Sequence, residues 1–341
     1  MKTLPPLPPK VAVIGAGAWG TALAAHAARL NLEVSLWAFE PEVADQINRE
    51  RVNQVFLPGV KLYGDLTASN DLGQVLDGQK LVLMVVPSHV MRAVAARMAP
   101  AVAPEALVIS ASKGIEDETS ATMVQILGKE LQHTSGLALG ALSGPSFARE
   151  VALGLPTAVT LAMKSHPLAQ AVQALLSAST FRIYTSLDLV GVELGGALKN
   201  VYAIAAGICE GFGLGLNARA AMLPRALCEM TRMAVAMGAN PRTMVGLSGM
   251  GDLVLTATGE LSRNRQVGFR LGEGEKLSDI LAGRRDVAEG INNARSAHGL
   301  ARRYQVEMPM AREVYRVLYE GKEPRQGLTE LLSRPLKAEL D

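Results

Sequence analysis

Cysteine and net charge are both scarce in this sequence. Only Cys209 and Cys228 occur among 341 residues, and a chain of this size that depended on disulfides would carry more. Both lie in apolar helical patterns, so we expect two buried thiols in a reducing compartment. No group of cysteines and histidines has the spacing of a zinc site, and we expect no metal centre. The formal net charge is only +2, so overall charge does not indicate a nucleic-acid partner.

Long uninterrupted apolar runs are also missing. The longest, residues 190–209, is broken by Glu193, Lys199 and Asn200, whereas a membrane helix needs about 20 residues with few charges. Residues 1–9 include prolines and no apolar run of signal-peptide length, so we expect a short flexible lead-in. We therefore expect no membrane insertion and a cytoplasmic location.

Hydrophobic residues, in contrast, make up 49% of the chain, which is enough for a large core. Apolar runs too short for ordinary helices recur in the first half, as expected for parallel strands covered on both faces. The candidate strands are residues 11–14, 33–39, 81–86, 106–111 and 137–142, with weaker candidates at 157–163 and 181–185. Helical segments alternate with them, which predicts a doubly wound α/β sheet.

After about Leu189, strand-like runs become rare and helical periodicity predominates. Helices are expected over residues 190–209, 218–237, 263–271, 292–304 and 308–319. The sequence thus predicts an α/β protein, with an N-terminal Rossmann-type doubly wound sheet over residues 10–190 and an all-α C-terminal domain over residues 191–341. We expect ligands to bind in a cleft between the two domains.

A glycine-rich turn, Gly15-Ala-Gly17-Ala-Trp-Gly20, follows the first expected strand and opens a helix. Gly15 suits a tight turn, Gly17 lets the backbone approach a pyrophosphate, and Gly20 lets the helix pack closely on the strand. Ala18 and Trp19 lie in the same turn. The strand–turn–helix context near the chain start predicts a dinucleotide site, with a ligand-free turn as the alternative.

The ribose of a bound dinucleotide is expected to meet an acidic residue about 20 residues past the last glycine. Glu40 occupies that position, directly after Phe39. A carboxylate suits the two free hydroxyls of NAD, whereas Arg49 or Arg51 would favour the 2′-phosphate of NADP if either reached it. Glu40 is equally consistent with a solvated residue at a helix start, so the choice between NAD and NADP stays open.

Lys199 lies within an apolar helical pattern, Glu193-Leu-Gly195-Gly196-Ala-Leu-Lys199-Asn200. A lysine there is unfavourable unless something pairs or uses it, and desolvation lowers its pKa into a range useful for proton transfer. Gly195 and Gly196 each weaken a helix by about 1 kcal/mol relative to alanine, which makes sense if another group approaches the helix closely. We interpret Lys199 as a proton donor and acceptor; the alternative is a lysine that extends to the surface.

Two further motifs contain candidate site residues. Asp252 follows the turn Ser248-Gly-Met-Gly251 and can hold a nearby lysine in place; a simple helix cap is the alternative. Ser262-Arg263-Asn264 leads into a helix, where backbone N–H groups, a hydroxyl and an arginine fork make a phosphate site. An ordinary solvated helix start is the alternative for this motif.

Two loops follow expected strands, at the edge where open α/β sheets bind ligands. One holds Lys113, in Ser112-Lys113-Gly114, and the other is Ser143-Gly144-Pro145-Ser146-Phe147-Ala148. We expect both loops to face the same cleft. His89, at another strand end, is an alternative acid or base.

Together these motifs strongly resemble the bacterial NAD(P)-dependent glycerol-3-phosphate dehydrogenases, over residues 10–332. The shared blocks are GAGAWGTALA, VPSHV, SKG, SGPSFA, VELGGALKNVYAIAAGI, GMGDLVLT and SRNR. They follow the family's order and approximate spacing. The resemblance implies an oxidoreductase that interconverts glycerol 3-phosphate and dihydroxyacetone phosphate by hydride transfer with NAD or NADP, supplying glycerol 3-phosphate for phospholipid synthesis.

The resemblance also assigns the family's functional residues to positions in this chain. The proton-transferring lysine falls on Lys199, its acidic partner on Asp252, and a second substrate lysine on Lys113. Further substrate contacts fall on Gly144, Ser146, Asn200, Thr256, Ser262, Arg263 and Asn264. Cofactor contacts fall on Gly15, Gly17, Ala18, Trp19, Gly20, Phe39, Glu40, Lys113, Ala148, Arg263, Val287 and Glu289.

The chain departs from the family at two cofactor positions. Ala18 stands where many members carry serine, which removes one hydroxyl contact to the cofactor phosphates. Phe39 stands where arginine or histidine often ends the second strand, which leaves the NAD or NADP preference open. The family also suggests a homodimer. Two rival functions remain: a dehydrogenase of another small hydroxy acid, and a non-catalytic sensor of the NAD(P) redox state.

Overall fold

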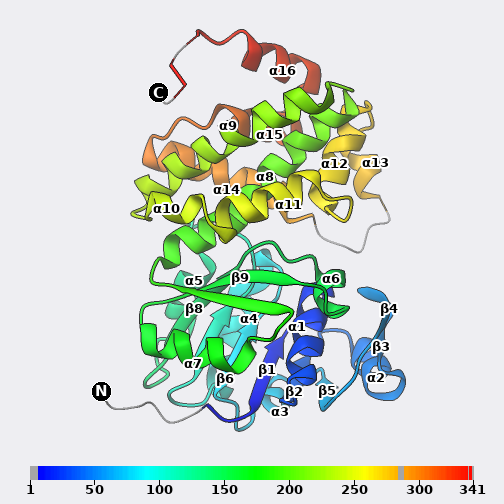
Figure 1. Ribbon diagram of the computed structural model, residues 1–341, viewed down its shortest axis with the longest axis vertical. Coiled ribbons are helices and arrows are strands. Elements are labelled where there is room, and N and C mark those ends of the chain that lie inside the picture. Colours follow the sequence, from blue (N-terminus) through cyan, green and yellow to red (C-terminus); the bar gives the residue numbers. More distant parts are fainter. Residues whose placement is uncertain (1–6, 283–287, 337, 340–341) are drawn as a thin grey trace.

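The computed structural model describes residues 7–282, 288–336 and 338–339. In these residues strands and helices are interspersed up to Ser186, and only helices follow (Figure 1). The strands of the main sheet are β1 (Lys10–Ile14), β2 (Glu33–Trp37), β5 (Leu66–Ser69), β6 (Leu81–Met84), β7 (Leu107–Ser110), β8 (Ala138–Ser143), β9 (Thr157–Met163) and β10 (Phe181–Ser186). The helices between them are α1 (Ala18–Arg29), α2 (Pro41–Glu50), α3 (Leu72–Leu76), α4 (Met91–Met98), α5 (Met123–Glu130), α6 (Ala148–Ala152) and α7 (His166–Leu176), with 3₁₀ turns η1 (Ser88–Val90) and η2 (Ala99–Ala101).

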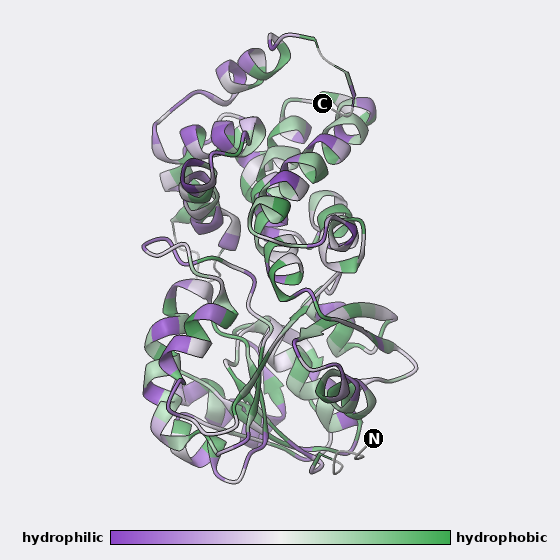
Figure 2. Cartoon of the chain, turned by 90° about the vertical axis from the view of Figure 1, so that its left-hand side faces the viewer, coloured by the Kyte–Doolittle hydropathy of each residue, from purple (hydrophilic) through white to green (hydrophobic). Residues whose placement is uncertain are grey.

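The sheet has the order β10-β9-β8-β7-β6-β1-β2-β5. Alternate residues of β1 enter different cores: Val11 and Val13 pack with α1, whereas Ala12 and Ile14 pack with α4 and α5. Both faces of the strand are therefore covered, which explains why the strand is apolar throughout. Figure 2 shows the apolar residues concentrated in the strands and the polar ones on the outer helices. The expected Rossmann-type sheet is confirmed.

The structure differs from the sequence expectation at two places in the sheet. Strand β5, whose apolar pattern is weak, was not predicted. Nor was the short antiparallel pair of β3 (Val52–Asn53) and β4 (Leu57–Lys61). In addition, β9 runs antiparallel to β8, whereas the other neighbouring pairs of the main sheet are parallel. The connecting helix α6 is only five residues long. At about 1.5 Å per residue it is too short to carry the chain back along a strand for a parallel crossover.

From Leu189 onward the regular elements among the described residues are helices. The helices are α8 (Leu189–Gly211), α9 (Gly215–Ala236), α10 (Pro241–Met244), α11 (Asp252–Thr258), α12 (Arg263–Gly272), α13 (Leu277–Leu281), α14 (Glu289–Tyr304), α15 (Pro309–Tyr319) and α16 (Pro324–Leu332), with a π-helical turn η3 (Leu247–Gly251). The expected all-α second part is confirmed. We propose to place the domain boundary near residue 190, at the start of α8.

Helix α8 is the centre of the helical part. It is long and apolar enough to cross a membrane, but 83% of its most apolar window is buried inside the protein. Residues from α9, α12, α14 and α15 complete the core around it. A helix that is apolar on all sides belongs in such a core. Cys209 on α8 and Cys228 on α9 are free and only partly buried, which corrects the expectation of two buried thiols. Cys209 packs at the edge of a small apolar cluster of Ala206, Met222 and Ala257.

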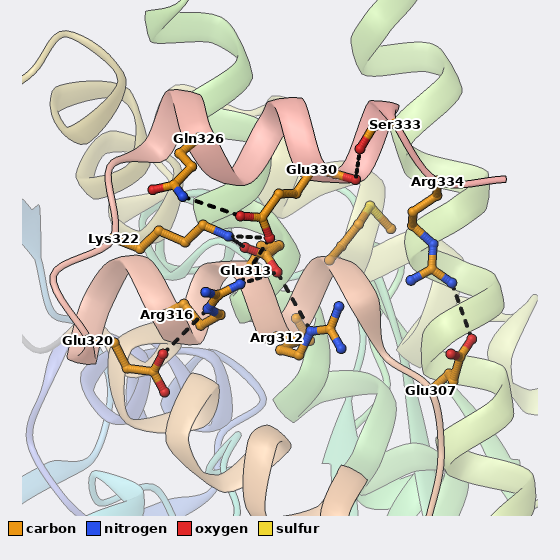
Figure 3. A network of polar contacts seen from close by, with 12 residues as sticks. Glu307, Arg312, Glu313, Arg316, Glu320, Lys322, Gln326, Glu330, Ser333 and Arg334 are labelled. Atoms are coloured by element: carbon orange, nitrogen blue, oxygen red, sulfur yellow. Dashed lines mark hydrogen bonds and ion pairs between the residues drawn. The ribbon is translucent and has the colours of Figure 1, made fainter.

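An ionic network holds α16 against α15 (Figure 3). The buried ammonium of Lys322 lies 2.7 Å from Glu330 and also contacts the buried carboxylate of Glu313. Arg316 lies 3.0 Å from Glu330 and 3.3 Å from Glu313. These ion pairs bridge the two helices at the end of the chain remote from the sheet.

Candidate active site

The glycine-rich turn has the geometry that its three glycines predict. Gly15 has a φ of +118°, and a Cβ there would lie 2.8 Å from the carbonyl oxygen of Val85. A Cβ on Gly20 would lie 1.8 Å from the carbonyl oxygen of Gly15, so only glycine lets α1 approach the turn. At Gly17, in contrast, a Cβ would meet nothing within 4 Å. The open side at Gly17 faces outward from the start of α1, where a pyrophosphate would bind.

The start of α1 fits a dinucleotide. The first N–H groups of a helix have no partner within the helix, and the helix dipole favours an anion there. The side chain of Trp19 adds a buried indole N–H that has no hydrogen-bond partner among the described residues. Ala18, the first residue of α1, is partly buried and offers only its backbone N–H. The backbone N–H groups of the turn suit an anionic group.

The residues expected to contact the ribose, Phe39 and Glu40, follow the end of β2. Glu40 is the N-cap residue of α2 and is partly buried, and its side chain makes no capping hydrogen bond. Phe39 is 68% exposed. The guanidinium of Arg51 donates to the carbonyl oxygens of Leu66 and Gly64, each at 2.6 Å. Arg51 is therefore occupied in holding the backbone, which argues against a contact to an NADP 2′-phosphate.

Two lysines converge on one carboxylate between the sheet and the helices. Lys199 of α8 donates to Asp252 Oδ1 at 2.5 Å and to the hydroxyl of Thr256 at 2.6 Å. Lys113, in the loop after β7, donates to Asp252 Oδ2 at 2.6 Å and to the carbonyl oxygen of Gly144 at 3.0 Å. Lys199 is only 6% exposed and Asp252 only 1%. The alternative of a surface lysine at 199 is therefore wrong.

Burial and two neighbouring charges set the pKa of Lys199. Desolvation lowers its pKa, and the neighbouring Asp252 carboxylate counteracts this by stabilising the ammonium. The positive charge of Lys113 lowers the pKa further, so that it falls to about 8. A lysine with this pKa exchanges protons readily near neutral pH, which is what a general acid or base requires.

Gly195 and Gly196 of α8 allow two other segments to approach the helix closely. A Cβ on Gly195 would lie 2.4 Å from the carbonyl oxygen of Ser248, in η3. A Cβ on Gly196 would lie 2.5 Å from the hydroxyl of Ser143 and 3.3 Å from Lys113 Cγ. The helix-weakening glycines therefore bring the Lys113 loop and the turn before Asp252 against α8, which explains their presence.

The residues expected to grip the phosphate lie at the start of α12. Ser262 is the N-cap residue and accepts from the backbone N–H of Arg265 at 3.2 Å. Asn264 donates to the side-chain oxygen of Asn200 at 2.9 Å and accepts from the N–H of Gly290 at 3.0 Å. Arg263 is exposed. The carboxamides are thus fixed, and the arginine faces solvent.

The loop after β8 adjoins the lysine pair. Gly144 has a φ of +145°, and its carbonyl oxygen accepts from the Ser146 hydroxyl at 2.9 Å as well as from Lys113. Ala148 begins α6 and is partly buried. Gly144 therefore lies beside the lysine cluster, as expected for a substrate loop.

Three expected site residues lie elsewhere in the chain: Glu289, Val287 and His89. Glu289, at the start of α14, accepts from the backbone N–H of Ser88 at 3.1 Å and from its hydroxyl at 2.6 Å. Val287 lies outside the described residues. His89 is exposed on η1, and no hydrogen bond joins it to the lysine cluster among the described residues. The sequence reasoning missed Asn293, a fully buried asparagine on α14 that contacts the Lys113 loop.

Comparisons with known proteins agree with this geometry. Residues 10–169 match the family model of the NAD-dependent glycerol-3-phosphate dehydrogenase N-terminus, and residues 188–329 match that of the C-terminus. The chain is 52% identical to the glycerol-3-phosphate dehydrogenase [NAD(P)+] of Geobacter sulfurreducens over 97% of this chain and 98% of the relative. It is 53% identical to the enzyme of the same name from Syntrophobacter fumaroxidans over 97% of each chain.

Solved structures include a member of the same enzyme family and a more distant protein of the same fold. The glycerol-3-phosphate dehydrogenase of Coxiella burnetii superposes with a TM-score of 0.91 at 39% identity, covering 95% of this chain and 99% of that one. A ketopantoate reductase from Ralstonia eutropha, at 19% identity and a TM-score of 0.60 over 94% of this chain and 99% of that one, shares the fold alone. With both halves matched and this level of identity over nearly its whole length, the chain belongs to the NAD-dependent glycerol-3-phosphate dehydrogenase family.

Proposed function

We propose that this protein interconverts glycerol 3-phosphate and dihydroxyacetone phosphate with NAD or NADP as the redox partner. The supporting observation is the buried cluster of Lys199, Asp252 and Lys113, which combines a proton-transfer group with excess positive charge. The relatives named glycerol-3-phosphate dehydrogenase [NAD(P)+] give the substrate pair. Both substrates carry a phosphate, which suits a site with more cationic than anionic groups.

Lys199 is the proposed acid and base. A nicotinamide cofactor, when bound in the turn at the start of α1, would supply the hydride chemistry at C2 of glycerol 3-phosphate and dihydroxyacetone phosphate. In the oxidative direction neutral Lys199 removes the proton of the C2 hydroxyl, and in the reductive direction the protonated lysine returns it. Asp252 and Thr256 orient the amine through the contacts at 2.5 and 2.6 Å. Lys113 binds the substrate oxygen as a second, positively charged donor.

The phosphate of the substrate is proposed to bind at the start of α12. Ser262 and Asn264 flank the free N–H groups of the first turn, where the helix dipole favours an anion. Arg263, exposed at the first helical position, supplies a guanidinium fork for the phosphate oxygens. Gly144, Ser146 and Asn200 are proposed to line the rest of the substrate site. Gripping the phosphate fixes C2 relative to Lys199.

The cofactor is proposed to bind along the turn at the start of α1. Gly15, Gly17 and Gly20 shape the pyrophosphate site, and Ala18 and Trp19 contribute donors there. Phe39 and Glu40 are proposed to contact the adenosine half, and Ala148, Arg263, Val287 and Glu289, with Lys113, the other half. Because Glu40 lies at the ribose position and Arg51 is occupied elsewhere, we propose a preference for NAD over NADP.

Assays of NADH oxidation and NADH binding separate this function from its rivals. We expect the purified protein to oxidise NADH when dihydroxyacetone phosphate is added, measured by the loss of reduced-nicotinamide absorbance. The Lys199→Ala variant should lose about 10²- to 10⁴-fold in kcat while still binding NADH, as measured by fluorescence titration. Turnover of a phosphate-free hydroxy acid instead would favour the other dehydrogenase. Binding of NADH without any turnover would favour the redox sensor.

Three further properties are proposed from the resemblance to this family. We propose that the protein is a cytoplasmic homodimer that supplies glycerol 3-phosphate for phospholipid synthesis. Light scattering coupled to size-exclusion chromatography tests the dimer: a mass of one chain, rather than two, would contradict it. A growth requirement for added glycerol 3-phosphate in cells that lack the protein tests the metabolic role.

A further inference from the structure

One face of α14 forms hydrogen bonds with the loops after β6 and β7, the second of which carries Lys113. Residues 289, 293 and 296 recur on that face at the spacing of helical neighbours. Glu289 accepts from Ser88, and the hydroxyl of Ser296 donates to the carbonyl oxygen of Ile115 at 2.9 Å. Between them, Asn293 donates to the carbonyl oxygen of Lys113 at 3.2 Å. The three side chains form a polar face of α14 against the loops after β6 and β7.

Asn293 differs from its two neighbours because it contacts both active-site segments. It is fully buried, and its amide also donates to the carbonyl oxygen of Ala197 at 2.9 Å. Ala197 lies on α8, two residues before Lys199. One carboxamide thus joins the backbone of one active-site lysine to the helix that carries the other. Removing it would take this donor from the buried carbonyl of Ala197 and the part-buried carbonyl of Lys113, which is unfavourable.

Glycine at position 114 makes this contact possible. A Cβ there would lie 3.3 Å from Asn293 Oδ1 and only 2.5 Å from the hydroxyl of Ser88. The Ser112-Lys113-Gly114 loop therefore passes against α14 without a side chain in between. Asn293 Oδ1 has no hydrogen-bond partner among the described residues. The Asn293 side chain therefore interacts through the two hydrogen bonds that its amide nitrogen donates.

We propose that Asn293 is a positioning residue that fixes the backbone of Lys113 against α8 and so sets the separation of the two active-site ammonium groups. This inference rests on the proposed function, because it matters for catalysis only if Lys199 transfers the proton. Asn293 does not touch the reacting groups; it acts through the segments that carry them.

The electrostatics of the cluster give the proposal a specific readout. Lys113 lowers the pKa of Lys199 by charge repulsion, while Asp252 raises it. Asp252 and Lys113 are the charged groups that act on Lys199 among the described residues. Arg265 of α12 is paired with Glu210, further along α8, and Glu289 of α14 is bound to Ser88. If Lys113 moves away, the repulsion weakens and the pKa of Lys199 must rise.

The test compares Asn293→Ala, which removes both donated bonds, with Asn293→Ser, which keeps a shorter donor, and with Asn292→Ala as the control. Asn292 is the preceding residue of α14, and no hydrogen bond of its side chain occurs among the described residues. We expect kcat to fall about 10- to 100-fold in Asn293→Ala, the range that small displacements of catalytic groups produce. Asn293→Ser should recover part of this loss, and Asn292→Ala should match wild type.

The second readout does not depend on catalysis. The pH titration of the Lys199 side chain, followed by NMR in protein labelled with ¹³C at lysine Cε and assigned with Lys199→Arg, should shift to higher pH in Asn293→Ala. The pH dependence of kcat should shift the same way. An unchanged Lys199 titration in folded Asn293→Ala, or in Asn293→Ser if the alanine variant does not fold, overturns the proposal. A wild-type protein that titrates as described but has no turnover would instead contradict the proposed function.

Discussion

Lys113 and Lys199 share the single carboxylate of Asp252, one through each of its oxygens, at 2.6 and 2.5 Å. One negative charge cannot balance two positive ones, so the cluster retains net positive charge in a buried place. That excess favours an anionic substrate and also disfavours protonation of Lys199. The same arrangement therefore provides both attraction for a phosphoester and a lysine with a pKa of about 8.

The lysine pKa predicts opposite pH profiles for the two directions of reaction. Oxidation needs neutral Lys199, so its rate should rise as the pH increases through about 8. Reduction needs the protonated lysine, so its rate should fall over the same range. Steady-state kcat measured from pH 6 to 10 in both directions tests this. Profiles that rise together, or that lack an ionisation near pH 8, would show that another group controls the proton.

Replacing the shared carboxylate should lower both the pKa of Lys199 and the stability of the protein. In Asp252→Asn the charge that raises the pKa of Lys199 is gone, so that pKa should fall below about 8. The oxidation profile should shift to lower pH, and kcat should drop because the amine is no longer oriented. Breaking a buried ion pair typically destabilises a protein by about 3–5 kcal/mol, so the melting temperature should also fall. A variant with wild-type stability and pH profile would contradict the assigned role of Asp252.

A matched pair of glycine substitutions tests the close packing of α8. In Gly195→Ala the new methyl would lie 2.4 Å from the backbone oxygen of Ser248, so the turn before Asp252 must move. We expect lower thermal stability and lower kcat. Gly299, inside α14, has nothing within 4 Å of the added Cβ, so Gly299→Ala should stabilise the protein by about 0.5–1 kcal/mol. Equal effects of the two substitutions in calorimetry would refute the packing argument.

The coenzyme preference should depend on Glu40. A carboxylate accepts hydrogen bonds from the ribose hydroxyls of NAD and repels the 2′-phosphate of NADP. Wild-type protein should therefore have a higher kcat/KM with NADH than with NADPH, and Glu40→Ser should reduce that ratio. The exposed Glu42, in the first turn of α2, provides a control of the same charge change in Glu42→Ser. A ratio that responds equally to both substitutions would mean that overall charge, and not Glu40, sets the preference.

The strands and the dinucleotide turn were predictable from the sequence because their signals are local. Residues 11–14 and 81–84 are apolar throughout. In the turn, Gly15 adopts a positive φ and Gly20 lies against the carbonyl oxygen of Gly15, within the same strand, turn and helix. The antiparallel β9 was not predictable, because the apolar pattern of a strand does not encode its direction. The edge strand β5 has the sequence Leu-Thr-Ala-Ser, which is half polar and forms no apolar run.

By itself, the sequence determined that Lys199 lies in an apolar helix and therefore needs a partner, because the free-energy cost of a buried charge follows from the residues around it. Only the tertiary structure decided which partner. The contacts to Asp252 span 53 residues from Lys199 and 139 from Lys113, and that of Asn293 to Lys113 spans 180. No periodicity links positions so far apart; packing of α8, α11 and α14 on the loop after β7 brings them within hydrogen-bond distance.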